Sequence, residues 1–290
     1  MIDVIIPTYR RYDLLPETLE SVRGQTFKDW RCWITEDGCD PETEKCIRPF
    51  LNDERFTYIT GEHSGCPAAA RNRAIKEGKE KYIALLDNDD IWFPEKLEKQ
   101  LTFMDAHPKC AMSGTNGYSW KGGSYNIDNL KLYHEKIPYG RISLNFLLKQ
   151  NCFIASSGMV RRTSIEQAGL FNENLHPPIG EDIELWYRLC AVGELWFMED
   201  PLILYRKHTD EKYYSTLQGE NLKKWRLGLL KSVLRGTNIP SPYSAPENSD
   251  IRELVEDRIN YFQTSPHMFG ETGYKLKKVL GIIPRKNQDA

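Results

Sequence analysis

The stretch that decides the fold runs from Lys81 to Asp90 and reads KYIALLDNDD. Its first six residues are mostly apolar, which is typical of a strand buried on both faces of a parallel sheet. Four polar residues, Asp87-Asn88-Asp89-Asp90, follow this strand directly. Ligands of open α/β sheets bind beyond the carboxyl ends of the strands. The position of these four residues therefore makes them candidates for a binding site.

Strands and helices alternate on both sides of this stretch. Strands are expected at residues 2–7, 30–35, 56–60 and 81–86, and a helix follows each of them. The helix at 65–78 is rich in alanine, and the helix after Pro94 has an apolar face. This alternation up to about residue 115 predicts βαβ crossovers and an α/β fold with a Rossmann-like, mostly parallel sheet flanked by helices.

The remainder of the chain has a different pattern. In residues 116–215, a strand is expected at 153–160, a capping box at Thr163 and Glu166, a helix at 183–192 and a last strand at 202–205. Residues 216–290 are predicted to form a helical C-terminal extension. Its helices are expected at 220–235 and 251–262, with a proline-rich segment at 237–250 between them.

The composition excludes several classes of protein. The chain of 290 residues carries 39 lysines and arginines against 41 aspartates and glutamates, a formal charge of −2. This balance argues against a nucleic-acid partner. The sequence has no run of about 18 apolar residues and no signal peptide at its start, so we expect a cytoplasmic protein. Its seven cysteines contain no C-x-x-C pair and are expected to be reduced thiols.

The acidic cluster at residues 87–90 has two interpretations. Clustered carboxylates repel one another and are costly to bury, so a compensating cation is expected beside them. A hard ion such as Mg²⁺ or Mn²⁺ takes oxygen ligands, and a site with one or two carboxylates leaves positions for phosphate oxygens. The alternative is a solvated helix start, because acidic residues before Pro94 favourably face the helix dipole.

Two further acidic turns accompany the first. Glu36-Asp37-Gly38 closes another strand, where a carboxylate accepts hydrogen bonds from a base or ribose at the sheet edge. Arg71 and Arg73 are candidate phosphate neutralisers, although a solvated helix face has the same composition. Gly180-Glu181-Asp182 opens a helix, either as an acidic helix start or as the position of a general base. Two acidic strand ends on one edge indicate a nucleotide site.

Six motifs occur in the order seen in family 2 glycosyltransferases, and the chain resembles these GT-A enzymes over roughly residues 1–210. The motifs are Ile5-Ile6-Pro7-Thr8-Tyr9-Arg10, Glu36-Asp37-Gly38-Cys39, Gly65-x-x-x-Ala69-Ala70-Arg71-Asn72, Leu86-Asp87-Asn88-Asp89-Asp90, Glu181-Asp182 and Tyr205-Arg206-x-His208.

The resemblance implies a GT-A fold and an inverting transfer from a nucleotide-diphosphate sugar, usually a UDP-sugar. The acceptor is expected to be a hydroxyl of a glycan or a lipid-linked sugar in bacterial surface polysaccharide synthesis. The expected cofactor is Mn²⁺ or Mg²⁺. Residues 1–215 would form the catalytic domain, with a nucleotide-sugar half at 1–115 and an acceptor half at 116–215.

The resemblance also assigns a role to individual residues. Asp182 would be the general base, and Glu181 would place or contact the acceptor. For the donor, the resemblance implies that Pro7, Tyr9 and Asp37 hold the nucleoside and that Arg71 lies near the nucleotide. Asp87 would contact the ribose or diphosphate. Asp89 and His208 would bind the metal.

Some alternatives remain open. The family more often has aspartate at the position of Glu36, and a lone histidine such as His208 is more often structural. A sugar-phosphate nucleotidyltransferase would carry a glycine-rich loop after the first strand, which Thr8-Tyr9-Arg10-Arg11 lacks. A catalytically inactive sugar-binding module is the other alternative. The basic tail at 274–284 either lies on an anionic membrane surface, as a peripheral contact at the inner membrane, or packs on the catalytic domain.

Overall fold

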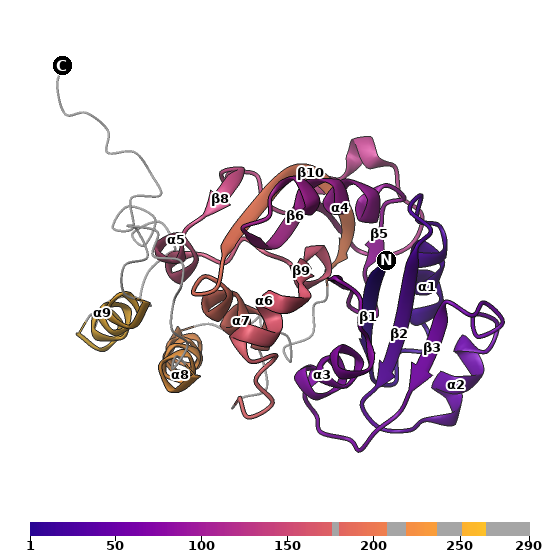
Figure 1. Cartoon of the computed structure of the whole chain (residues 1–290), viewed down its shortest axis with the longest axis horizontal. Helices are drawn as coiled ribbons and strands as arrows, with labels where there is room; N and C mark the ends of the chain where they lie inside the picture. Colours follow the sequence, from indigo (N-terminus) through magenta and orange to yellow (C-terminus); the bar gives the residue numbers. More distant parts are fainter. Residues whose placement is uncertain (176–179, 208–218, 237–250, 265–290) are drawn as a thin grey trace.

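The computed structural model describes residues 1–175, 180–207, 219–236 and 251–264. Within these ranges, the chain forms a sheet of ten strands with helices on both sides (Figure 1). The strand order is β3-β2-β1-β4-β9-β6-β10-β5, with β7 paired to β6 and β8 paired to β10. The α/β architecture expected from the sequence is confirmed.

The first four strands of the sheet are parallel, as the βαβ pattern predicts. β1 and β4 are buried along their whole length because helices cover the sheet, which explains their apolar composition. The strands are β1 (Ile2–Thr8), β2 (Trp30–Glu36), β3 (Phe56–Ile59) and β4 (Tyr82–Leu85), and helices α1 (Leu15–Arg23), α2 (Pro41–Ile47) and α3 (Pro67–Glu77) connect them.

Beyond β4 the sheet is mixed. β9 (Met159–Arg161) lies antiparallel between β4 and β6 (Cys110–Trp120), and β6 runs parallel to the long β10 (Glu194–Arg206). The expected boundary between residues 115 and 116 falls inside β6, so one continuous strand joins the two predicted halves. The shorter strands are β5 (Ile91–Trp92), β7 (Lys131–Leu132) and β8 (Gly140–Ile142).

One local prediction in this half is only partly right, and another is wrong. Of the strand expected at 153–160, only Met159 and Val160 lie in a strand, β9, whereas Ala155–Ser157 form a turn of 3-10 helix closed by the bond from Ser157 N to Ile154 O. The capping box at Thr163 and Glu166 does not form, because α6 (Arg162–Ala168) already begins before Thr163 and has no side-chain cap.

The helices of the C-terminal extension share the core of the catalytic domain. α8 (Gly219–Gly236) packs on α7 (Glu181–Leu189), and α9 (Ile251–Thr264) packs on α8 and on α5 (Leu144–Lys149) (Figure 1). Trp225 and Phe262 belong to the same buried cluster as Trp186. α4 (Lys96–Ala106) covers the other side of the sheet near β6.

Several expectations lie outside the described residues. They are the proline-rich segment at 237–250, the basic tail at 274–284 and His208. Among the helices that the structure describes, none has the length and apolar character that crossing a membrane requires.

Candidate active site

The carboxyl ends of β1, β2 and β4 lie next to one another, which confirms that the two acidic turns share one edge of the sheet. Asp37 N donates to Thr8 O at 2.9 Å, and Asn88 Nδ2 donates to Thr8 Oγ1 at 3.2 Å. Thr8, at the end of the central strand β1, therefore links the turn after β2 to the loop after β4. Pro7 is buried inside β1, opposite Thr35 of β2.

Asp37 is held tightly by the segment that precedes α3. Its Oδ1 accepts hydrogen bonds from Ser64 N at 2.7 Å and Ser64 Oγ at 2.8 Å, and its Oδ2 accepts from Gly65 N at 2.8 Å. His63 Nδ1 lies 3.0 Å from the same Oδ2. Both carboxylate oxygens are thus engaged by residues 63–65, and only 5% of Asp37 is exposed. Asp37 fixes this segment across the end of β2.

His63 also covers one face of Tyr9. The two rings are stacked with their centroids 4.4 Å apart. Tyr9 is 43% exposed, and the Arg10 guanidinium lies 5.3 Å from the centre of its ring. The segment after β1 therefore presents an aromatic surface at the sheet edge, and His63 is in contact with that surface.

The four polar residues after β4 have different partners. Asp90 points inward, with only 1% exposed, and accepts hydrogen bonds from Ser156 Oγ at 2.6 Å and Arg206 N at 2.8 Å. Ser156 Oγ also accepts from Asp87 N at 3.0 Å. Asp90 therefore ties the loop to the end of β10, while Asp87 and Asp89 remain partly exposed.

Arg71 connects this loop to α7. Its Nη2 lies 2.6 Å from Asp87 Oδ1, and its Nη1 is ion-paired with Glu181 Oε1. The Arg71 side chain is only 4% exposed, so the ion pairs lie in a poorly solvated environment. Burial by itself lowers the pKa of Arg71, but the charges of Asp87 and Glu181 outweigh burial and raise it. Arg71 is therefore a fixed cation between the two halves of the domain.

Asp182 lies in the same electrostatic cluster. Burial raises the pKa of this carboxyl to about 7, the negative charge of Glu181 adds to the increase, and the positive charge of Arg71 opposes it. A general base works best when its pKa lies near the working pH. The cluster therefore gives Asp182 the protonation behaviour that a base needs, whereas Glu181 is committed to Arg71.

The residues present fit a hard divalent cation. Asp87 and Asp89 offer carboxylate oxygens at the sheet edge, and burial together with the charge of Asp89 raises the pKa of Asp87. Arg11 compensates part of this charge, with its Nη2 3.2 Å from Asp89 Oδ2. Among the residues described, no three acidic, histidine or cysteine side chains form a complete metal cage. Two carboxylates leave positions for diphosphate oxygens, as magnesium sites do.

Three residues of this region were missed from the sequence. Arg11 compensates Asp89, His63 covers Tyr9, and Ser156 joins Asp87 to Asp90. For Arg11 a signal existed, because it directly follows the motif at residues 5–10. Nothing in the local sequence distinguishes His63 or Ser156 from ordinary loop residues.

Comparison with known sequences identifies the family of this chain. Residues 3–169 match the profile of the family described as Glycosyl transferase family 2. This match covers more than half of the chain, so the protein belongs to glycosyltransferase family 2.

Several related proteins and solved structures are similar to this chain, and they differ in how much of each protein the similarity covers. An uncharacterized glycosyltransferase of Rickettsia bellii is 36% identical over 193 residues, which are 66% of this chain but only 26% of the relative. The chain thus spans about a quarter of that protein. The glucosyltransferase WfgD of Escherichia coli is 31% identical over 77% of this chain and 83% of its own. Among solved structures, S. aureus TarS with UDP-GlcNAc has a TM-score of 0.69 at 16% identity, covering 91% of this chain and 73% of TarS.

Proposed function

We propose that the protein is an inverting glycosyltransferase. It transfers a sugar from a UDP-sugar to a hydroxyl of a glycan or lipid-linked acceptor in bacterial surface polysaccharide synthesis, at the cytoplasmic face of the membrane. The observation that carries this proposal is the half-buried Asp182 with its pKa near 7, held beside Arg71 at the edge where the strands end. Such a carboxylate is suited to accept a proton from a hydroxyl at neutral pH.

The donor is proposed to lie across the ends of β1, β2 and β4. Tyr9 offers an exposed ring for a nucleobase, and Asp37 directly follows β2 at the same edge of the sheet. The names of similar proteins support a UDP-sugar: WfgD is described as using UDP-Glc with a GlcNAc-diphosphoundecaprenol acceptor, and TarS is described in complex with UDP-GlcNAc.

The chemistry follows from a single displacement. Asp182 accepts the proton of the acceptor hydroxyl while the hydroxyl oxygen attacks the anomeric carbon from the face opposite the diphosphate. The bond between this carbon and the diphosphate oxygen breaks, and the nucleoside diphosphate leaves with the bonding electrons. Because attack and departure occur on opposite faces, the anomeric configuration inverts.

The residues around the diphosphate each have one task in this proposal. Arg71 holds Asp87 and Glu181 in place and keeps positive charge near the reacting centre. Asp89, with Asp87 beside it, would hold Mn²⁺ or Mg²⁺. When bound, the ion stabilises negative charge that develops on the departing diphosphate.

The first tests concern the sugar donor and the general base Asp182. A panel of UDP-sugars is screened for UDP release with and without candidate acceptors. In Asp182→Asn, we expect UDP affinity by calorimetry to stay the same and turnover to fall by about 10² to 10⁴, the typical contribution of a general base. Unchanged turnover in this variant would contradict the assignment of Asp182.

The metal is tested separately. Asp89→Ala is expected to weaken Mn²⁺-dependent UDP binding, measured by calorimetry with and without EDTA. Asp105→Ala is the matched control, because Asp105 pairs on the surface with Lys81, which precedes β4 and so lies at the opposite end of that strand from Asp89. If Asp89→Ala bound UDP and Mn²⁺ with wild-type affinity, Asp89 would not be a ligand.

A further inference from the structure

Gly180 precedes α7 and sets the direction in which the chain enters the helix that carries Glu181 and Asp182. Its φ of 81° and ψ of 25° lie in the left-handed region, which glycine adopts without the strain that a Cβ causes. Its carbonyl oxygen accepts the first hydrogen bond of the helix, from Glu184 N at 3.0 Å, and no side chain caps α7 within the described part of the chain. The position of Asp182 therefore depends on how Gly180 is held.

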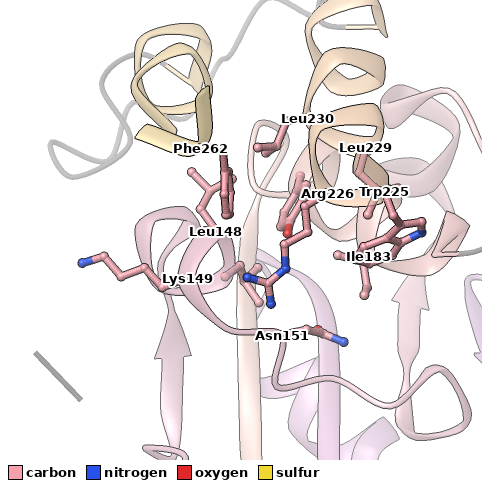
Figure 2. Close-up of a pocket in the computed structure, with 11 residues that line it drawn as sticks. Leu148, Lys149, Asn151, Ile183, Trp225, Arg226, Leu229, Leu230 and Phe262 are labelled. Carbon is pink, nitrogen blue, oxygen red and sulfur yellow. The ribbon is translucent and has the colours of Figure 1, made fainter. Parts of the chain in front are cut away.

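The indole ring of Trp225, on α8, packs against Gly180. A Cβ at position 180 would overlap Trp225 Cζ2 and would lie 3.4 Å from Leu229 Cδ1. Trp225 is only 5% exposed, and Figure 2 shows it extending from α8 beside Ile183, the residue after Asp182. The space left between α8 and its neighbours has a volume of about 20 Å³, which is room for about one water molecule. The ring therefore restrains the start of α7 by close contact.

A second contact fixes α8 on the same part of the fold. Ser232 lies about two helical turns after Trp225, so both side chains are on one face of α8. Ser232 Oγ accepts a hydrogen bond from Asn172 Nδ2 at 2.6 Å and donates to Glu184 Oε1 on α7 at 3.4 Å. α8 is therefore attached to α7 at two points, and this attachment keeps the Trp225 ring in place.

Arg71 holds the same helix start from another element. It lies on α3, and its guanidinium is ion-paired with Glu181, the residue before Asp182. The ion pair restrains the side chain of Glu181, whereas the ring of Trp225 restrains the backbone at Gly180. Two elements far apart in the sequence therefore fix the residues that lead into Asp182.

We propose that Trp225 is a positioning residue for the transfer reaction: its ring holds Gly180 so that the Asp182 carboxylate is directed at the acceptor hydroxyl. Reacting atoms must be closely aligned, and a displacement of about 1 Å caused by a distant substitution can lower the rate about 10²-fold. The C-terminal extension thus contributes to catalysis through α8. This inference rests on the proposed function, because it concerns the base of that reaction.

The first test replaces the ring but keeps an apolar side chain. Trp225→Met fills part of the same space with a flexible chain, so the core stays apolar but Gly180 loses its rigid neighbour. We expect turnover, measured by UDP release from the most active UDP-sugar of the panel, to fall by about tenfold to 10²-fold. UDP affinity by calorimetry should be unchanged, because the nucleotide is proposed to lie at the ends of β1, β2 and β4. Trp225→Phe retains a flat ring and should recover most of the turnover.

The pH dependence of turnover reports where the Asp182 carboxyl lies. Burial raises its pKa, and the nearby charges of Glu181, Arg71 and Asp87 all remain in Trp225→Met. Movement of the helix start admits water to the carboxyl, so the rising limb of the rate should shift to lower pH. A purely structural role for the ring would lower the unfolding temperature and leave the limb in place.

Leu230→Ala is the matched control for lost packing. Leu230 is a buried residue of α8 in the same core cluster, but the side chains nearest to Gly180 are those of Trp225 and Leu229. This variant should have a lower unfolding temperature, with wild-type turnover and an unmoved limb. Wild-type turnover in Trp225→Met, or an equal loss of turnover in Leu230→Ala, would overturn the proposal.

Gly180→Ala tests the same contact from the other side and does not depend on whether Trp225→Met folds. Its Cβ pushes against the indole ring, so turnover should fall by about tenfold or more while UDP affinity is retained. When Gly180→Ala is combined with Trp225→Phe, the smaller ring leaves room for the Cβ, so the double variant should turn over faster than Gly180→Ala alone. The backbone strain at Gly180 is the same in both variants. Equal or slower turnover in the double variant would overturn the proposal.

Asp182→Asn separates this inference from the proposed function. If Asp182→Asn lost turnover while Trp225→Met kept it, only the role of Trp225 would fail. If Asp182→Asn kept turnover, the assignment of the base would itself fail.

Discussion

Arg71 Nη2 lies 2.6 Å from Asp87 Oδ1, and the same guanidinium is ion-paired with Glu181 on the other side. Asp87 follows β4 in the first half of the domain, and Glu181 begins α7 in the second half. One buried cation therefore joins the loop proposed to contact the donor to the helix that carries the proposed base. The contact stabilises the fold, and in the proposed reaction it would also position the loop and the helix for catalysis.

Arg71→Gln is expected to lower the free energy of unfolding by about 3–5 kcal/mol, because it leaves the carboxylates of Asp87 and Glu181 without their buried partner. Urea unfolding measures this change. Arg48→Gln is the control: Arg48 is 73% exposed and 4.0 Å from Glu44, and such surface pairs contribute at most about 1 kcal/mol. Equal losses in the two variants would show that Arg71 acts only as a surface charge.

The rate of transfer is expected to rise with pH up to about 7 and then level off. Asp182 acts as a base only when it is deprotonated, and its pKa is about 7. Glu181→Gln removes the negative charge that adds to this pKa, so the rising limb should move to lower pH. Glu166→Gln, at a half-exposed residue of α6, should leave the limb in place. UDP release between pH 5 and 9 provides the measurement, and an unmoved limb in Glu181→Gln would contradict the coupling.

His63→Ala is expected to tighten UDP binding. His63 stacks on the Tyr9 ring at 4.4 Å, so a nucleobase must displace it to use that face. Aromatic stacking contributes about 0.5–1.5 kcal/mol, which corresponds to a change in affinity of about two- to tenfold. His107→Ala is the control, because His107, which directly follows α4, stacks on Phe103 at 4.0 Å and lies away from the site. Weaker UDP binding in His63→Ala would mean that His63 contacts the base directly.

The first four strands of the fold were predictable because their signals are local. A buried strand such as β4 is apolar along its whole length, and the polar residues that follow it mark the sheet edge. β6 was missed because its 11 residues include glycine, serine and asparagine, which are unfavourable in strands taken alone. β6 forms because β9 and β10 pair with it on both sides.

The sequence singled out residues for the candidate site but not the contacts between them. The motifs supply Arg71 and Glu181, but these residues are 110 positions apart, and no sequence pattern states that they pair. Glu36 departs from the pattern more common in the family. Its buried carboxylate accepts hydrogen bonds from Thr43 Oγ1 at 2.7 Å and Asp40 N at 3.1 Å, so it fixes the start of α2.

Lys96 is buried behind the sheet, and it is expected to make stability depend on pH. Its Nζ donates to Gln100 Oε1 at 2.6 Å and lies 4.0 Å from the Trp92 ring centre. Burial lowers the pKa of Lys96 well below its ordinary value. Between the folded and unfolded pKa values, the unfolded chain binds a proton that the folded chain does not. The free energy of unfolding should therefore rise with pH towards the unfolded pKa of about 10.4 and fall as pH drops.

Lys96→Met removes this titration, so its free energy of unfolding should vary less than that of the wild type between pH 7 and 10. The difference in slope has an upper limit of about 1.4 kcal/mol per pH unit for one proton. Urea unfolding at three pH values measures it. Lys99→Met is the control on the same helix, because Lys99 is 45% exposed and pairs with Asp200 at 2.6 Å, which raises its pKa. Equal slopes for wild type and Lys96→Met would show that Lys96 stays charged over Trp92 in the folded protein.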